Sequence, residues 1–562
     1  MIPYANLIAA LDAAPGDRPF VTMWIDEDER ETVTFGEFRA RAREQANSLA
    51  AHGIASGDRV VLIMAQGIPA IVAFTAAMML GAVPAFLAYP NFKVEPSKYQ
   101  SGLAGVTANL SAKAVVIDKD FPQEMLTCVT LDGGSLLLRA GKTLSAKESS
   151  ELRTQIRPGD LAFIQHSAGT TGLQKGVALT HAAVLRQLGY LSDALKIDPS
   201  NDRIYNWLPL YHDMGLMACF MLPMVCHVPV VMQSPIDWVM QPEAMLQVID
   251  ECKCTLGWMP NFAFQFVPRR TPQNRWKDYD LSSLRLLINC SEPVRATSMQ
   301  EFENAFSIPP GVLQSSYAMA ENVFAVTQSD VSTSGPTRIV VDAQTFRREH
   351  SVVAAGTENS STLTFVSSGR VLPNHEIRIL SDEGSMLQTD FVGEIAIQSD
   401  CLFDGYYNRP DLTEQAIVDG WYHTGDLGFL HDSELFVVGR KKDLLIVGGE
   451  NIYPQDIEEL VAAHPAIHDG RAIALGVYNP ELGTEDIVVV AEVEQPALLA
   501  NATELEQELR TRVVSGMGVA VRMFYLKPPK WIVKSTAGKA ARAATREKLL
   551  QEHPELNGDR SA

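Results

Sequence analysis

Residues 163–177 read Phe-Ile-Gln-His-Ser-Ala-Gly-Thr-Thr-Gly-Leu-Gln-Lys-Gly-Val, an apolar strand start followed by a turn of small residues. Glycines let the backbone turn tightly and bring its N–H groups up to an anion. Thr170, Thr171 and Lys175 add hydroxyl donors and one positive charge. The stretch therefore predicts a loop that holds phosphate oxygens. Its spacing is not that of a G-x-x-x-x-G-K-[ST] loop, and taken alone it could also be a surface turn.

Apolar runs on both sides of this loop alternate with helical patterns. Residues 34–52 predict a helix, because Phe38, Ala42, Ala46 and Leu49 fall on one face. Alternation of this kind predicts an α/β fold with mostly parallel strands. The other expected strands are 113–117, 161–164, 228–232 and 284–288, and the other expected helices are 182–195 and 243–252.

One segment is long and apolar enough to raise the question of a membrane span. No charged residue occurs in 65–92, and 68–88 is almost wholly apolar. Gly81 and Pro84 divide it into a helix-like and a strand-like half, and a buried strand pattern, 60–64, precedes it. Strand, helix and strand in this order are typical of a parallel sheet covered on both faces, so we expect no integral membrane insertion.

A chain of 562 residues exceeds what one hydrophobic core supports, so at least two domains are expected. We predict a large domain, 1–438, of mixed sheets with helices, which includes a β-rich subdomain of short strands and turns from Val371 onward. It carries an insertion at about 330–362, where Ser, Thr, Gly and Asn are frequent. Within it, 337–346 alternates weakly like a strand. A small, mobile α+β domain, 439–562, follows, with a polar linker at 441–443 near its start.

Composition excludes some partners and compartments. The net charge of −20 argues against a nucleic-acid partner, which needs a basic footprint. The seven cysteines include no C-x-x-C pair and are interpreted as reduced thiols. The N-terminal sequence lacks the pattern of a signal peptide, so a cytoplasmic protein is expected.

Further motifs follow the Gly/Thr loop in a fixed order, and it is this order that is specific. They are 207–215 (Trp-Leu-Pro-Leu-Tyr-His-Asp-Met-Gly), 291–293 (Ser-Glu-Pro), 317–321 (Tyr-Ala-Met-Ala-Glu), 422–426 (Tyr-His-Thr-Gly-Asp), 439–443 (Gly-Arg-Lys-Lys-Asp), 448–454 (Gly-Gly-Glu-Asn-Ile-Tyr-Pro) and 535–539 (Ser-Thr-Ala-Gly-Lys). Order and spacing resemble the adenylate-forming superfamily, which includes acyl-CoA synthetases, fatty acyl-AMP ligases, peptide-synthetase adenylation domains and luciferases. The resemblance covers nearly the whole chain.

The resemblance implies that a carboxylate attacks the α-phosphorus of ATP, giving an acyl-AMP and pyrophosphate. Such an enzyme needs a phosphate cradle, a metal, a ribose anchor and a positive charge beside the attacking carboxylate. Glu321 matches the magnesium ligand, and Lys539 matches the lysine between carboxylate and α-phosphate. Lys442 matches the hinge about which the small domain rotates.

The remaining implied sites group by what they would bind. Asp426, assisted by Arg440, would hold the ribose hydroxyls, and Tyr317 would line the adenine site. The phosphate loop would contribute Ser167, Gly169, Thr170, Thr171, Gly172 and Lys175, of which Thr170 and Lys175 would be catalytic. Further nucleotide contacts would come from Ser291, Glu292, Pro293, Ala318 and Met319, and acyl contacts from His212, Asp213, Trp258, Asn261 and Phe262.

Each residue also has a structural interpretation. Lys539 could be a solvated charge in a basic tail, Glu321 a helix cap and Asp426 the end of a turn. His212 could be a satisfied core histidine, and Trp258 with the nearby phenylalanines could simply pack. Their joint occurrence in family order favours the catalytic interpretation.

Within the superfamily, the closest resemblance is to the fatty acyl-AMP ligases, on 207–216, 260–263, 292–295, 454–458 and the long segment 337–370. In that branch the insertion docks on the small domain and disfavours the pose that CoA requires. The expected acceptor is then the phosphopantetheine thiol of an acyl carrier protein acting in trans, since no carrier motif follows the ligase motifs. The expected substrate is a fatty acid, with chain length and aromatic acids left open.

Several residues depart from the branch pattern and keep alternatives open. Gly448-Gly-Glu-Asn-Ile-Tyr453 is more similar to acyl-CoA synthetases, so a CoA ligase is the second hypothesis. Gln174 and Ala168 replace a proline and a serine, and Val533, Ser535 and Ala537 depart from the usual basic loop. The third hypothesis is a non-catalytic relative that binds acyl groups or nucleotides. It is disfavoured because Glu321, Asp426 and Lys539 are all present.

Overall fold

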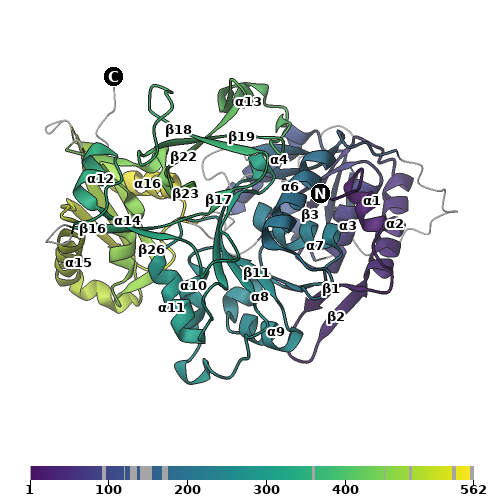
Figure 1. The fold of residues 1–562 in the computed structure, drawn as a ribbon, viewed down its shortest axis with the longest axis horizontal. Helices are drawn as coiled ribbons and strands as arrows, with labels where there is room; N and C mark the ends of the chain where they lie inside the picture. The colour runs from purple at the N-terminus through teal and green to yellow at the C-terminus, as the bar shows by residue number, and fades with distance from the viewer. Residues whose placement is uncertain are drawn as a thin grey trace.

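The computed structural model of the chain describes residues 2–90, 96–118, 120–126, 136–139, 155–166, 175–356, 361–448, 450–479, 484–534 and 540–556. The elements after Tyr453 gather on one side of the molecule together with α12 and β16, whereas the N-terminal helices α1, α2 and α3 lie on the opposite side (Figure 1). The arrangement is the mixed α/β fold that the alternating pattern predicts.

A four-stranded parallel sheet, ordered β4-β3-β5-β6, forms the first layer. Its strands are β3 Arg59–Ile63, β4 Val83–Phe86, β5 Ala114–Ile117 and β6 Leu136–Arg139. Helix α3, Ile68–Met79, connects β3 to β4, and every one of its residues except Pro69 is buried. The uncharged segment is therefore the predicted β-α-β unit. Within the described ranges, no helix combines the length and hydrophobicity needed to cross a bilayer.

A large mixed sheet forms the centre of the molecule, ordered β18-β19-β22-β23-β17-β14-β13-β12-β11-β9-β10-β1-β2. The run from β1 to β13 is parallel, as predicted, whereas every pairing from β13 to β18 is antiparallel. The parallel run consists of β1 Pro19–Trp24, β9 Ile204–Asn206, β10 Val230–Gln233, β11 Leu256–Met259, β12 Leu286–Asn289 and β13 Leu313–Ala318. The other members are β2 Arg30–Thr34, β14 Ala325–Gln328, β17 Arg370–Val371, β18 His375–Leu380, β19 Gly393–Ser399, β21 Ile417–Val418, β22 Trp421–His431 and β23 Glu434–Arg440.

Helices cover both sheets through apolar faces. Helix α2, Phe35–Ala51, buries the predicted face of Phe38, Ala42, Ala46 and Leu49, and begins with a capping box between Thr34 and Glu37. The other helices of this part are α1 Leu7–Asp12, α4 Pro96–Leu110, α5 Gln123–Leu126, α6 His181–Leu195, η1 Met214–Met221, α7 Leu222–Cys226, α8 Pro235–Met240, α9 Ala244–Cys252, α10 Ala263–Arg270, η2 Gln273–Arg275, α11 Ala296–Phe306, η3 Ala320–Asn322 and α13 Pro410–Ala416.

The Gly/Thr stretch lies in a small sheet of its own. Strand β7, Leu161–His166, pairs antiparallel with β8, Gly176–Thr180, which in turn pairs with β20, Gly405–Tyr406. The strand expected at 161–164 therefore belongs to an antiparallel hairpin and not to the parallel sheet. The intervening residues 167–174 lie outside the described residues.

The predicted insertion is a strand hairpin with a helix inside it. Strands β15 Arg338–Asp342 and β16 Thr362–Val366 pair antiparallel, and α12, Ala343–Glu349, follows β15 directly. The weak alternation at 337–346 predicted a strand, which ends at Asp342 because the Asp342 side chain accepts a hydrogen bond from Thr345 N and caps the helix.

The residues after Leu444 build hydrophobic cores without members from the large sheet. A three-stranded sheet carries these cores, with β26 Ile467–Asn479, β27 Thr484–Val493 and β28 Met523–Lys527. The other elements of this C-terminal region are η4 Lys441–Asp443, β24 Leu445–Val447, β25 Glu450–Ile452, α14 Pro454–Ala462, η5 Pro496–Asn501, α15 Ala502–Met517, α16 Arg542–Glu552 and η6 Pro554–Leu556.

Among the described residues, contacts near α11 and at α12 join the C-terminal region to the rest of the chain. On one side, Arg295 beside α11 forms an ion pair with Asp456 of α14, with 2.9 Å between Nη2 and Oδ1. On the other, α12 packs against β25, and Arg347 Nη1 donates to the Met517 carbonyl oxygen at 2.8 Å. The insertion and the C-terminal region therefore touch directly, and α12 lies on the same side of the molecule as α14 and α15 (Figure 1).

Candidate active site

The carboxyl end of β13 carries the centre of the candidate site. Tyr317 is near the end of this strand, and Glu321 follows in the short helix η3. Ligands of α/β sheets bind at the carboxyl ends of parallel strands, where side chains from neighbouring elements converge. Here the neighbours are β22 and β23, which supply Asp426 and Arg440.

Asp426 is held through both carboxylate oxygens. The Tyr317 hydroxyl donates to Oδ2 at 2.7 Å, and Arg440 Nε lies 3.3 Å from Oδ1. Asp426 and Arg440 are directly opposite each other in the β22–β23 pairing. Burial, followed by the charge of Asp426, raises the pKa of Tyr317 well above its usual value, so its hydroxyl stays a donor. A fixed carboxylate between these two partners suits the predicted binding of vicinal hydroxyls.

Glu321 is approached by a residue that the sequence motifs did not identify. The Tyr406 hydroxyl donates to Glu321 Oε1 at 2.8 Å and lies 3.3 Å from the Tyr422 hydroxyl. Burial, then the charge of Glu321, raises the pKa of Tyr406, which keeps its proton available for this bond. The Glu321 carbonyl oxygen also accepts from Phe403 N at 2.8 Å.

Tyr406 also contacts the described end of the Gly/Thr stretch. Lys175 Nζ lies 4.5 Å from the centroid of the Tyr406 ring, a cation–π contact. One tyrosine therefore joins the predicted phosphate lysine to the predicted metal carboxylate. The only signal for it in the sequence is the run 405–410, Gly-Tyr-Tyr-Asn-Arg-Pro, near the 422–426 motif.

Several predicted site residues lie outside the described residues, so the structure does not place them. They are Ser167, Gly169, Thr170, Thr171, Gly172 and Lys539. The ends of the basic loop are described: Lys534 and Ala540 form an antiparallel bridge, and Ala541 N donates to the Val533 carbonyl oxygen at 2.8 Å. Arg542, just after the loop, pairs with Asp443 next to the predicted hinge residue Lys442, with 3.0 Å between Nη1 and Oδ2.

The predicted contacts at 291–293 and 261–262 are brought together beyond β11 and β12. Glu292 Oε2 accepts from Phe262 N at 3.0 Å. Asn261 Oδ1 accepts from Asn289 Nδ2 at 2.9 Å and from Arg295 N at 3.0 Å. These bonds join the ends of two parallel strands, so Asn261 has a structural role here, and its contact with substrate stays a prediction. Ser291, Pro293, Ala318 and Met319 are half-buried around the same strand ends.

Aromatic side chains surround Phe262, which is 39% exposed. The rings of Trp207 and Trp238 stack with centroids 3.5 Å apart, and the Phe262 ring lies roughly perpendicular to both, at centroid distances of 6.4 and 6.3 Å. Trp258 is buried within β11. The pair Trp207–Trp238 was not among the predicted acyl contacts, because the motif pointed to His212 and Asp213.

His212 and Asp213 lie at the start of the π-helix η1. Asp213 caps this helix, since its Oδ1 accepts from Met214 N at 2.8 Å, and the His212 ring is 4.7 Å from that of Tyr211. A Cβ on Gly215 would meet the Pro209 carbonyl oxygen at 2.4 Å, so only glycine fits this turn. π-Helical turns are frequent at functional sites.

Magnesium fits the donors at Glu321. The described part of the chain contains no cluster of three or more His, Cys, Asp or Glu side chains that could hold a metal alone. Magnesium, however, is commonly bound by one or two carboxylates together with substrate phosphates. The hydrogen bond from Tyr406 orients the Glu321 carboxylate through one oxygen, Oε1.

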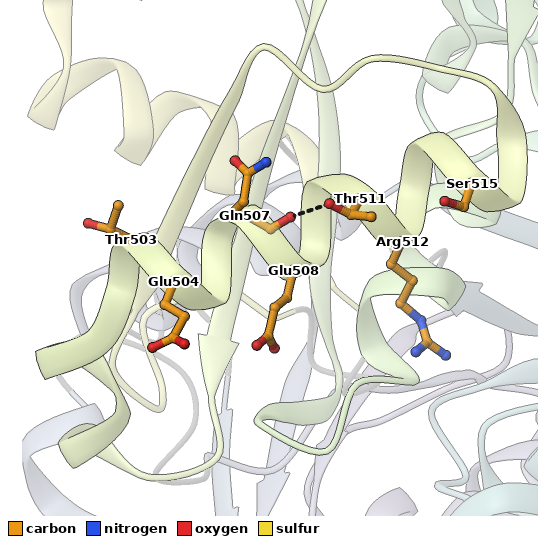
Figure 2. A pocket seen from close by; sticks show the side chains of 7 residues that line it. All are labelled: Thr503, Glu504, Gln507, Glu508, Thr511, Arg512 and Ser515. Carbon is orange, nitrogen blue, oxygen red and sulfur yellow. Dashed lines mark hydrogen bonds between the residues drawn. The ribbon is translucent and has the colours of Figure 1, made fainter.

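A shallow depression on α15 lies apart from these residues. Its volume is about 870 Å³. Figure 2 shows its lining along one side of the helix, where Thr511 Oγ1 donates to the Gln507 carbonyl oxygen. None of the predicted site residues lines it. The lining consists of Thr503, Glu504, Gln507, Glu508, Thr511, Arg512 and Ser515.

Comparison with known proteins agrees with this geometry. The model of the AMP-binding enzyme family matches residues 9–407, so the chain belongs to this family. It is 28% identical to the long-chain-fatty-acid–AMP ligase FadD28 of Mycobacterium tuberculosis, over 98% of either chain. It is 30% identical to the medium-chain-fatty-acid–[acyl-carrier-protein] ligase JamA of Moorena producens, over 93% of this chain and 91% of JamA.

Solved structures give the same assignment. A structure from a study of fatty acyl-adenylate ligases of E. coli and L. pneumophila superimposes with a TM-score of 0.91, at 29% identity and 99% coverage of both chains. A phenylalanyl-adenylate complex of McyG matches with a TM-score of 0.87 at 22% identity, which shows the fold alone. The protein is thus an adenylate-forming ligase that uses ATP.

Proposed function

We propose that the protein activates a fatty acid as its acyl-AMP and transfers the acyl group to the phosphopantetheine thiol of an acyl carrier protein. The observation that carries the first step is the convergence of Tyr317, Asp426 and Arg440 with Glu321 and Tyr406 at the end of β13. The names of FadD28 and JamA support a fatty acid as substrate, and that of JamA supports the carrier protein.

In the first step a carboxylate oxygen attacks the α-phosphorus of ATP, and the bond to the β-phosphate oxygen breaks to release pyrophosphate. Asp426 and Arg440 would hold the ribose, and Tyr317 would line the adenine site. Lys175 and the Gly/Thr loop would bind the outer phosphates. Glu321 would hold magnesium, which supplies charge neutralisation on the phosphates when bound. Lys539 would place its positive charge between the attacking carboxylate and the α-phosphate.

In the second step the thiol attacks the acyl carbonyl, a thioester forms and AMP leaves. We propose that residues 439–562 act as a small domain that rotates about Lys442 between the two steps, with 1–438 as the large domain. Lys442 is exposed in the turn η4, a position that tolerates changes of backbone angle. The predicted cytoplasmic location and the magnesium dependence belong to the same proposal.

The choice of acceptor rests on the insertion. Three side chains at the end of α12 reach the C-terminal region: Arg347 to the Met517 carbonyl oxygen at 2.8 Å, Arg348 Nε to Glu450 Oε1 at 2.8 Å, and His350 Nδ1 to Asn451 Nδ2 at 3.0 Å. Arg347 is buried in this contact. Such contacts would restrain rotation of the small domain and so disfavour the pose for CoA, which supports the carrier protein over CoA as acceptor.

Mass spectrometry of the products tests the proposal. The protein is incubated with ATP, Mg²⁺ and a panel of fatty and aromatic acids, alone, with CoA, and with a phosphopantetheinylated carrier protein. We expect acyl-AMP that persists with CoA and is consumed by the carrier protein. Acyl-CoA with free AMP would make the protein a CoA ligase, and absence of any acyl-AMP would favour a non-catalytic relative.

Two sets of variants connect the products to the residues. Lys539→Ala should nearly abolish acyl-AMP formation, whereas Lys530→Ala, an exposed lysine in the same C-terminal segment, should not. The double variant Arg347→Ala/Arg348→Ala should raise the acyl-CoA fraction. Arg338→Ala is the matched control, because Arg338 also lies in the insertion but pairs with Glu303 of α11. An unchanged acyl-CoA fraction in the double variant would refute the restraining role.

A further inference from the structure

The residue two positions after Glu321 has an unusual backbone conformation. Val323 has φ +63° and ψ −54°, and Phe324 N donates to the Asn322 carbonyl oxygen at 2.6 Å. This is a γ-turn with positive φ at its centre, a rare and strained turn. For a β-branched residue a positive φ is a genuine outlier. The Val323 side chain is fully buried, so no solvent-exposed loop accounts for the conformation.

The side chain of Asn322 holds this turn in place. It is fully buried, and its Nδ2 donates to the Ala325 carbonyl oxygen and to His375 Nε2, both at 2.9 Å. Its Oδ1 accepts from Ser399 Oγ at 2.5 Å. One amide thus connects the turn to three strands, β14, β18 and β19.

The proton positions around His375 follow from its second contact. His375 Nδ1 lies 2.8 Å from the Pro373 carbonyl oxygen, which can only accept, so Nδ1 carries the proton. Nε2 of the neutral ring is then the acceptor that Asn322 Nδ2 requires. Every hydrogen bond of the Asn322 amide therefore joins one donor to one acceptor.

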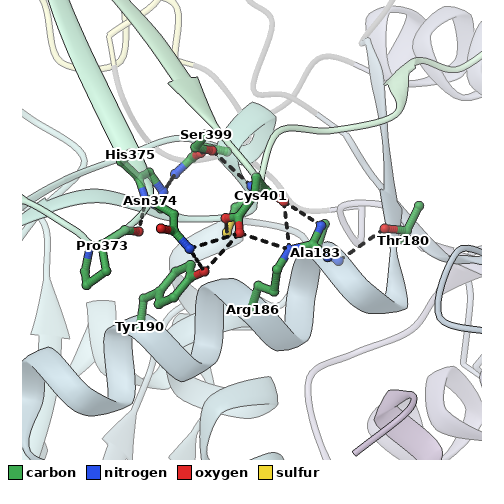
Figure 3. A network of polar contacts seen from close by, with 11 residues as sticks. Thr180, Ala183, Arg186, Tyr190, Pro373, Asn374, His375, Ser399 and Cys401 are labelled. Carbon is green, nitrogen blue, oxygen red and sulfur yellow. Dashed lines mark hydrogen bonds and ion pairs between the residues drawn. The ribbon is translucent and has the colours of Figure 1, made fainter. Parts of the chain in front are cut away.

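The residues beside His375 and Ser399 anchor the network to helix α6. Tyr190 of α6 donates to Asp400 Oδ2 at 2.9 Å, and Arg186 Nε donates to the Asp400 carbonyl oxygen at 2.9 Å. Asn374 Nδ2 reaches both the Tyr190 hydroxyl and Asp400. Figure 3 shows the side chains of Arg186, Tyr190 and Asn374 meeting above α6, next to His375 and Ser399.

We propose that the strained turn at Val323, held by the buried amide of Asn322, is a positioning device that fixes the direction of the Glu321 carboxylate. Strained backbone persists only where the surroundings over-determine it, and it concentrates at functional sites. Relaxation of the turn would rotate η3 and move Glu321 away from Tyr406. Asn322 and His375 are thus positioning residues, and this inference rests on the proposed role of Glu321 as the magnesium ligand.

The strain is tested by paired substitutions. At ordinary φ, alanine gives a more stable protein than glycine. Val323→Ala removes the two methyl groups of the valine and Val323→Gly removes Cβ as well, but only glycine accepts the positive φ without a Cβ penalty. Val323→Gly should therefore have the higher Tm of the two and the lower rate of acyl-AMP formation.

Val326 provides the matched control for this pair. It is equally buried, lies three residues further in β14, and has no positive φ. At this position the order should be the ordinary one, so Val326→Ala should have a higher Tm than Val326→Gly. The same order at Val323 as at Val326 would overturn the proposal that the turn is strained.

The link to Glu321 is tested by binding of Mn²⁺, which electron paramagnetic resonance detects directly in the presence of ATP. Asn322→Ala should weaken Mn²⁺ binding at least about tenfold, because it removes the hydrogen bonds that hold the turn beside the charged Glu321 carboxylate. It should leave KM for the fatty acid unchanged. His375→Ala should act likewise, whereas His375→Gln, whose amide oxygen can still accept from Asn322, should recover most of the binding.

Glu321→Gln separates the possible failures. If Glu321→Gln leaves Mn²⁺ binding unchanged, the proposed metal role of Glu321 is wrong. If Glu321→Gln abolishes binding while Asn322→Ala and His375→Ala do not weaken it, the metal role stands and the positioning role is overturned. The two His375 variants keep the test decisive even if Asn322→Ala does not fold.

Discussion

The Tyr317 hydroxyl donates a 2.7 Å hydrogen bond to Asp426 Oδ2. The bond connects β13, the last parallel strand of the large sheet, to β22 in its antiparallel part. It therefore fixes the Asp426 carboxylate near the place where the sheet changes from parallel to antiparallel pairing. Arg440 contacts the other carboxylate oxygen, Oδ1.

Tyr317→Phe removes this donor and leaves the ring in place. A hydrogen bond to a charged group contributes about 1.5–3 kcal/mol, so we expect KM for ATP to rise about tenfold or more, with a smaller change in KM for the fatty acid. Pyrophosphate exchange into ATP measures both. Tyr525→Phe is the control, since its hydroxyl contacts only Met523 Sδ among the described partners, at 3.4 Å. Equal KM for ATP in both variants would contradict the ribose-anchoring role.

Tyr406 joins two functions that substitutions can separate. Tyr406→Phe keeps the ring under Lys175 but loses the bond to Glu321, so the Mg²⁺ concentration for half-maximal activity should rise while KM for ATP changes little. Tyr406→Leu loses both contacts, and KM for ATP should then rise as well, since cation–π contacts contribute about 0.5–2 kcal/mol. Identical kinetics of the two variants would show that the ring contact with Lys175 does not matter.

The pair Arg295–Asp456 connects α14 to the start of α11, and Glu459 adds a second contact at 3.5 Å to Arg295 Nη1. If this pair stabilises the described arrangement, Asp456→Ala should raise the acyl-CoA fraction severalfold, and so should Arg295→Ala. The double variant should show no further increase over Arg295→Ala, because that change already removes the contact with Asp456. Fully additive effects in this cycle would mean that the two side chains act independently.

His181 predicts a loss of stability in acid. It is the first residue of α6 and is buried, and burial lowers its pKa to about 4. Below pH 6.5 the unfolded chain takes up a proton that the folded protein binds only near pH 4, so stability falls as the pH decreases between these values, by up to about 3 kcal/mol. His181→Gln should show a smaller loss in urea midpoint between pH 7.5 and pH 5. The same loss in both proteins would contradict this assignment.

Sequence patterns predicted those helices and strands that are determined by local residues or by the periodic spacing of apolar residues. The buried face of α2 and the β3-α3-β4 unit follow from spacing and from the lack of charge between Met64 and Lys93. Asp426 and Glu321 were predicted as site residues from the order of the motifs. Tyr406 was missed because its role arises from a contact with Glu321, 85 positions away, which no spacing reveals. Helix α12 was missed because its cap, Asp342, belongs to a strand pattern that continues into the helix.

Helix α3 has a consequence for the newly made chain. Its twelve residues carry no charge, and all except Pro69 are buried between the first sheet and α2. The helix precedes β4 and β5 in the chain, so its apolar surface stays uncovered until those strands emerge and pair with β3. Slow or interrupted synthesis after Leu80 would leave an apolar segment without its cover, and the yield of folded protein should then depend on chaperones that bind such segments.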